Sequence, residues 1–139
     1  MAANMATFRA AMDQVYGPFN DDNQDTINDW HPPALSPKSS RYLWTDAFAV
    51  INFITLSKLA TSPPDAERWK ICARTLIQTV HDTLGRTRDA SRRLSGATDH
   101  EPLAGGLRIG KDEDQGPDQD GQYHHYLTWG TCTYSFSNC

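Results

Sequence analysis

The sequence has few of the features that mark membrane, secreted or nucleic-acid-binding proteins. No apolar run approaches the roughly 18 residues that a membrane-spanning helix needs. The first residues also lack the apolar core of a secretory signal. Basic residues are not in excess, since 13 Lys and Arg stand against 17 Asp and Glu, for a net charge of −4. We therefore expect a cytoplasmic protein with neither a membrane nor a nucleic acid as its partner.

Cysteine is also scarce, with three residues in a chain of 139. Cys72, Cys132 and Cys139 lie far apart, and none belongs to the Cys-x-x-Cys pairs that are typical of structural zinc sites. An odd number of cysteines cannot pair completely in disulfides. We expect reduced thiols, no metal site and no cofactor.

Apolar residues make up 38% of the chain, which is low for a globular domain. They are concentrated between residues 41 and 84, and the length suffices for a single domain. The sequence predicts a short helix with a proline-rich lead-in over 1–40, a partial helical domain over 41–129, and an irregular tail over 130–139.

Two helices are predicted in the first half of the chain. Residues 3–16 carry apolar side chains at helical spacing and are followed by Gly17-Pro18, which ends a helix. The segment from Tyr42 to Ala60 is apolar on nearly every side, and it is too long for a typical strand. A helix of this kind belongs inside a larger protein, because a short chain cannot cover all of its faces.

A further helix is predicted from Pro63 to Leu84, with apolar residues on one side and polar residues on the other. Ser62 is expected to cap its start and Gly85 its end. Because the connection to the preceding helix is short, the two helices are expected to form an antiparallel hairpin. Residues 86–120 are loop-like, and 120–129 resemble the start of another helix.

Asp46 is the first candidate for chemistry. On the predicted helix it shares a face with Leu43, Val50 and Phe53, so its carboxyl group projects from an apolar surface. A carboxylate there is costly unless it is paired or hydrogen-bonded. Carboxyl groups in apolar surroundings can serve enzymes as general acids. A structural carboxylate, paired with Arg41 or another cation, is the alternative.

Further candidates are histidines and the polar residues of the long loop. His81 lies on the flank of its helix, where a half-buried structural histidine is the simpler interpretation. The adjacent residues His124 and His125 do not have the spacing of a metal-binding motif. Arg108 follows a Gly-Gly turn and is a candidate partner for an anion or a carboxylate. Carboxylates interleaved with aromatic rings suit sugar binding, because rings stack on the apolar faces of sugars. The loop and the segment after it contain Asp99, Glu101, Asp118, Asp120, Tyr123, Tyr126 and Trp129.

Five sequence blocks carry a family resemblance: Arg41–Phe48, Val80–Arg86, Leu94–Gly96, Gly105–Lys111 and Asp120–Leu127. Their order resembles the N-terminal part of proteins in the six-hairpin glycosidase-like superfamily, which fold as (α/α)6 toroids. The resemblance covers roughly residues 40–128 and implies an all-α fold and a carbohydrate-active protein, with hydrolase activity in the complete ring. Twelve helices need well over 200 residues. The chain is therefore expected to form an incomplete toroid, with one strong antiparallel hairpin, and to be inactive alone.

Three functions follow from these observations. A glycosidase would use Asp46 or another carboxylate as acid or base across the glycosidic bond. The superfamily also resembles sugar 2-epimerases, which move protons with histidines. Alternatively, the chain is a non-catalytic helical module that associates with itself or with a partner through the apolar face of residues 42–60. The predicted catalytic residues are Asp46, His81 and His124, and the predicted substrate-binding residues are Trp44, Arg108, Asp120 and Tyr123.

Overall fold

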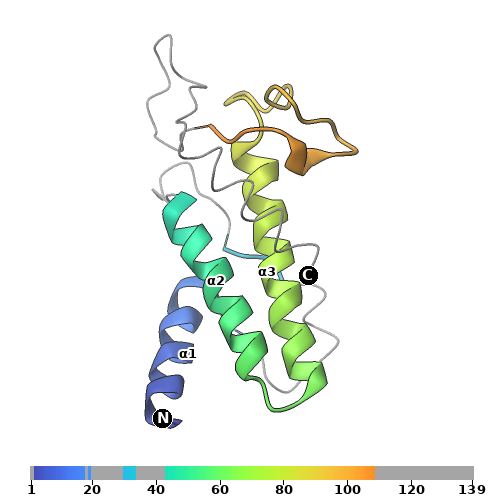
Figure 1. Cartoon of the computed structure of the whole chain (residues 1–139). Coiled ribbons are helices and arrows are strands. Elements are labelled where there is room, and N and C mark those ends of the chain that lie inside the picture. The colour runs from blue at the N-terminus through green and yellow to red at the C-terminus, as the bar shows by residue number, and fades with distance from the viewer. Residues whose placement is uncertain (1, 18, 20–29, 34–42, 109–139) are drawn as a thin grey trace.

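Within the residues that it describes, this computed structural model contains three α-helices and a short 3₁₀ turn (Figure 1). The structure describes residues 2–17, 19, 30–33 and 43–108. The elements are α1 (Ala2–Tyr16), α2 (Leu43–Leu59), α3 (Pro63–Leu84) and the 3₁₀ turn η2 (Pro102–Ala104). Within the described residues there is no strand, only an isolated bridge between Arg86 and Arg93. The prediction of an all-α chain is confirmed.

The predicted hairpin is formed by α2 and α3, which lie antiparallel and side by side (Figure 1). Ser62 caps α3 as expected, because its hydroxyl accepts a hydrogen bond from the Asp65 backbone N–H at 3.3 Å. Pro63 occupies the start of the helix, where no backbone donor is needed. Gly85 ends α3 with an ordinary φ of −81°. Glycine is required there by close approach, since a Cβ would collide with the His81 carbonyl.

The hydrophobic core is centred on Phe53 of α2, whose side chain is 0% exposed. Its ring contacts those of Tyr16, Phe19, Trp30 and Trp69, with centroid separations between 5.6 and 6.0 Å. Edge-to-face and stacked pairs of this kind contribute about 0.5–1.5 kcal/mol each beyond the burial of their area. Aromatic residues that precede the hairpin in sequence therefore help to form its core.

The buried residues of α2 lie on one side of the helix. Its buried residues are Leu43, Asp46, Ala47, Ala49, Val50, Phe53, Leu56 and Ser57. The opposite side exposes four apolar residues: Trp44, Phe48, Ile51 and Leu59. Across the part of the chain that the structure describes, no helix combines the length and apolar character needed to cross a membrane.

Candidate functional site

Asp46 is buried on the covered side of α2, with 2% of its surface exposed. The hydroxyl of Tyr16, at the end of α1, donates a hydrogen bond to Asp46 Oδ1 at 2.9 Å. The Tyr16 carbonyl in turn accepts a hydrogen bond from Trp30 Nε1 at 3.1 Å. Asp46 is thus linked to two segments that precede the hairpin in sequence. The expected partner, Arg41, lies outside the described residues.

The position of Asp46 favours a structural role. A carboxyl group at 2% exposure offers almost no surface to a dissolved sugar. Its hydrogen bond with Tyr16 fastens α1 to α2 across 30 positions of sequence. A buried hydrogen bond to a charged group contributes about 1.5–3 kcal/mol.

His81 is buried near the end of α3, with 2% exposure, deeper than its place on the helix flank indicated. The Pro102 backbone in η2 lies close enough to the ring to raise its pKa. Among the described residues, Nδ1 has no hydrogen-bond partner. Burial lowers the pKa of His81 below its usual value of 6.5, and it outweighs the opposing effects of Pro102 and Asp82. The nearby Arg93 guanidinium lowers that pKa further. The ring is therefore neutral at neutral pH and is closed off by η2.

An ion-pair network holds the segment after α3 against the end of that helix. The Arg93 guanidinium lies 2.8 Å from an Asp82 carboxylate oxygen and 2.9 Å from one of Asp99. Arg86 approaches the same Asp99 oxygen at 2.7 Å. The hydrogen bond from Arg93 and the charge of Arg86 lower the pKa of Asp99. Arg93 is only 9% exposed, so the network anchors it rather than presenting it to a ligand.

Arg108, a predicted substrate-binding residue, lies beside the end of α3. Its Nε donates a hydrogen bond to the Arg86 carbonyl at 3.0 Å, and its Nη2 donates to the Thr83 carbonyl at 3.5 Å. The Arg108 backbone N–H donates to the Leu84 carbonyl at 2.8 Å. A cationic side chain at a helix C-terminus satisfies exposed carbonyls and interacts favourably with the helix dipole. These contacts close the helix end.

The described candidates do not come together in one open site. Asp46 is held by Tyr16 of α1, whereas His81 is covered by η2. Trp44 lies on the side of α2 that faces away from Asp46 and is 38% exposed. The predicted residues Asp120, Tyr123 and His124 lie outside the described residues. No group of three metal-ligating side chains occurs within the described ranges.

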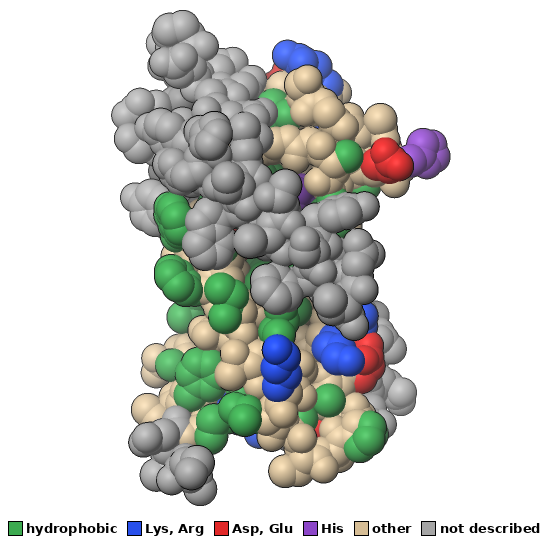
Figure 2. Space-filling view, in the orientation of Figure 1, with side chains coloured by type: hydrophobic (Ala, Val, Ile, Leu, Met, Phe, Trp, Pro, Cys, Tyr) green, Lys and Arg blue, Asp and Glu red, His purple; other side chains and the backbone are tan. Residues whose placement is uncertain are grey.

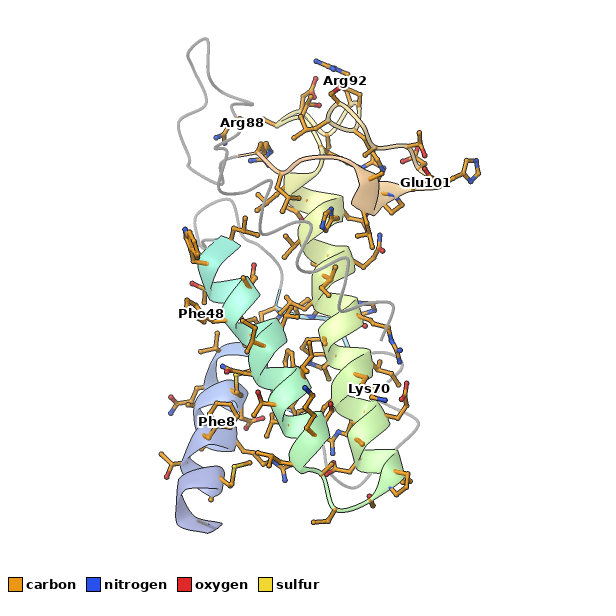
Figure 3. All side chains as sticks on the ribbon, in the orientation of Figure 1. Phe8, Phe48, Lys70, Arg88, Arg92 and Glu101 are labelled. Atoms are coloured by element: carbon orange, nitrogen blue, oxygen red, sulfur yellow. The ribbon has the colours of Figure 1, made fainter. Side chains whose placement is uncertain are left out.

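The exposed side of α2 carries apolar residues that have no part in the contacts of Asp46 or His81. We call Trp44, Phe48, Ile51 and Leu59 the outer face of α2; their exposed fractions run from 38% to 57%. In Figure 3, Phe48 projects away from α2, and Arg88, Arg92 and Glu101 lie on the segment that follows α3. Apolar side chains are visible on the surface in Figure 2. The chemistry of this face is that of a packing surface, because it offers aromatic and aliphatic groups with few polar ones.

Comparison with known proteins identifies no relative. Neither a protein-family model nor a curated protein nor a solved structure matches the chain.

Proposed function

We propose that this chain is a helical module of a carbohydrate-active, cytoplasmic protein of the six-hairpin type, and that the chain alone catalyses no reaction. Its role is to supply a helical hairpin whose outer α2 face packs against a further helix. The observation that carries the proposal is the row of exposed apolar residues on a helix that is already buried on its other side.

The size of the outer face supports this role. Four side chains of about 200 Å² each, roughly half exposed, amount to about 400 Å² of apolar surface. Covering that area would contribute on the order of 10 kcal/mol before the cost of association is subtracted. An area of about 400 Å² lies within the range of the largest apolar patch on a typical monomer, about 300–600 Å², and such patches are often functional. A second helix laid on this face would bury it in the way that α3 buries the opposite side.

The state of the candidate acids and bases supports the absence of catalysis. A glycosidase needs two carboxyl groups that flank a bound sugar, and an epimerase needs an imidazole that reaches a sugar proton. Asp46 and His81 are each 2% exposed, and Asp46 is hydrogen-bonded to Tyr16 of α1. Within the described residues, no observation favours the histidine mechanism. The carbohydrate class itself is supported by the sequence blocks.

Turnover measurements test the absence of catalysis. The purified chain is assayed against chromogenic α- and β-glycosides, and sugar epimerisation is followed by exchange of the C2 proton in D₂O. We expect no rate above the blank for the wild type or for Asp46→Asn. A wild-type rate that Asp46→Asn abolishes without unfolding the chain would refute the proposal.

The genomic sequence tests the larger assembly. If the chain is part of a six-hairpin ring, the reading frame beyond the codon for Trp129 should encode further hairpins with apolar faces, directly or after an intervening segment. A locus that encodes only these 139 residues would contradict the proposal that the chain is part of a toroid. The helix that packs on the outer face of α2 would then have to come from another chain.

A further inference from the structure

We propose that uptake of a proton by the buried His81 ring detaches residues 86–108, the segment that follows α3, from the end of that helix. This conformational change involves neither the outer face of α2 nor a sugar, so it is independent of the proposed function. Opening of the segment should become more frequent as the pH falls from about 6.5 to about 5, where a histidine in water becomes charged.

The 86–108 segment lies at the C-terminal end of α3 (Figure 1), where the His81 ring is buried. η2 packs against α3, and the Pro102 backbone lies close to the ring. Leu94 and Leu107 of the same segment are buried as well. Because these contacts shield the ring, detachment of the segment would admit water to it.

The segment is attached to the helix end by few bonds. The Leu94 backbone N–H donates to the Gly85 carbonyl at 2.9 Å, and the Arg108 backbone N–H donates to the Leu84 carbonyl at 2.8 Å. The ion pairs of Arg93 end on carboxylates that are largely exposed, and such pairs contribute little to stability. We therefore expect the segment to open while the hairpin of α2 and α3 stays folded.

A proton on His81 would be poorly stabilised while the segment is closed. Among the described residues, Nδ1 of the ring has no hydrogen-bond partner. Asp82 of α3 favours the charged ring, but its carboxylate is already paired with the Arg93 guanidinium at 2.8 Å, and that guanidinium opposes the charged ring. η2 carries no titratable side chain, and the buried Asp46 of α2 accepts a hydrogen bond from Tyr16.

The ion pairs around Arg93 should keep their charges over the same pH range. Burial raises the pKa of Asp82, but hydrogen bonds from Arg93 and Gln78 bring it below its usual value. A hydrogen bond from Arg93 and the charge of Arg86 lower the pKa of Asp99. Both carboxylates therefore stay ionised in mild acid, and the charge that changes at this contact is that of His81. The other ionisable side chains of the segment are Arg88, Asp89, Arg92, His100, Glu101 and Arg108.

Proton linkage gives the sign and the size of the effect. Burial, together with Arg93, lowers the pKa of His81 below 6.5 in the closed form, whereas the ring in contact with water has a pKa of about 6.5. The open form therefore takes up the proton first as the pH falls. While the ring stays neutral in the closed form, the ratio of open to closed chains should rise by up to about tenfold from about pH 7.5 to about pH 5.5.

Native-state amide hydrogen exchange of the full chain, measured by NMR at about pH 7.5, 6.5 and 5.5, tests this change. Each exchange rate is divided by the intrinsic rate of the same amide at that pH, which gives its protection. Protection of the Leu94 and Arg108 amides should fall by up to about tenfold over this range. It should also be weaker at every pH than that of the Phe53 amide, which reports on the opening of the hydrophobic core.

Two variants assign the effect to one histidine. His81→Gln removes the titrating group and should abolish the pH dependence of protection at Leu94 and Arg108. The control His100→Gln removes an exposed histidine of the same segment and should leave that dependence unchanged. Far-UV circular dichroism monitors folding. If His81→Gln loses helicity, NMR titration of the His81 ring protons in the wild type takes its place, and its midpoint should lie below 6.5.

Three results would overturn the proposal. The first is protection at Leu94 and Arg108 that changes by less than about twofold over the whole pH range. The second is an equal pH dependence in His81→Gln, or a ring midpoint at or above 6.5 where that variant does not fold. The third is equal protection of Leu94, Arg108 and Phe53, because the segment would then detach only when the whole chain unfolds.

Discussion

Removal of the Tyr16 hydroxyl should weaken the chain markedly, although Tyr16→Phe deletes a single oxygen atom. That hydroxyl donates to Asp46 Oδ1 at 2.9 Å, and both residues are 2% exposed. The variant keeps the ring, whose centroid lies 6.0 Å from that of Phe53, so apolar packing is unchanged. The lost hydrogen bond to a buried carboxyl group should lower the free energy of unfolding by about 2 kcal/mol. For a domain of this size the melting temperature should fall by about 8 °C.

Urea denaturation followed by circular dichroism and by tryptophan fluorescence measures the change. Asp46→Asn serves as the second arm of a double-mutant cycle with Tyr16→Phe, and the coupling free energy should be about 1–2 kcal/mol. A Tyr16→Phe variant whose free energy of unfolding lies within about 0.3 kcal/mol of the wild-type value would refute the reasoning. The hydrogen bond to Asp46 would then be no stronger than the hydrogen bonds that the hydroxyl makes with water in the unfolded chain. If Tyr16→Phe lowers the free energy of unfolding strongly but the cycle shows no coupling with Asp46→Asn, the hydroxyl of Tyr16 would be stabilised by a residue other than Asp46.

Three further predictions concern the core and its buried titratable groups. Phe53→Ala should lower the free energy of unfolding by about 3–5 kcal/mol, and Phe53→Leu by clearly less, because the leucine refills part of the cavity; chemical denaturation measures both. The pKa of His81 lies below 6.5 in the folded chain, so the unfolded chain takes up the proton first as the pH falls. Stability should therefore decline below pH 6.5, and His81→Gln should make this part of the pH profile flatter; an unchanged slope would contradict the burial of the ring. Burial raises the pKa of Cys72 to about 12, far above the usual value of a thiol. With Cys132 and Cys139 replaced by serine, the folded chain should react with a thiol reagent about a thousandfold more slowly than the unfolded chain; rapid labelling of the folded chain would refute this.

The candidate site was predicted from the sequence only in part. The apolar surroundings of Asp46 could be anticipated, because they follow from the spacing of its neighbours on one helix. The hydrogen bond from Tyr16 could not, since the two residues are 30 positions apart and no local pattern relates them. The same holds for Arg108, because its contacts with the end of α3 depend on how the intervening loop returns to the helix.

The helices themselves were determined by the sequence. Helix ends depend on local signals, and the Ser62-Pro63 start of α3 and its end at Leu84 appear in the structure where the sequence indicates them. The apolar character of α2 also follows from its residues alone. These features rest on interactions within a few positions along the chain, so they can be read without knowledge of the fold.

The tertiary structure decided which side of α2 faces water. The sequence shows that α2 is apolar all round, but only tertiary packing, by α1, α3 and the rings of Phe19 and Trp30, determines that Phe53 is enclosed while Phe48 is exposed. Likewise, His81 is buried where η2 packs against α3, a contact between segments that no local pattern relates. Contacts between segments distant in sequence depend on the closure of long loops, and hydrophobicity alone does not fix which apolar surfaces meet.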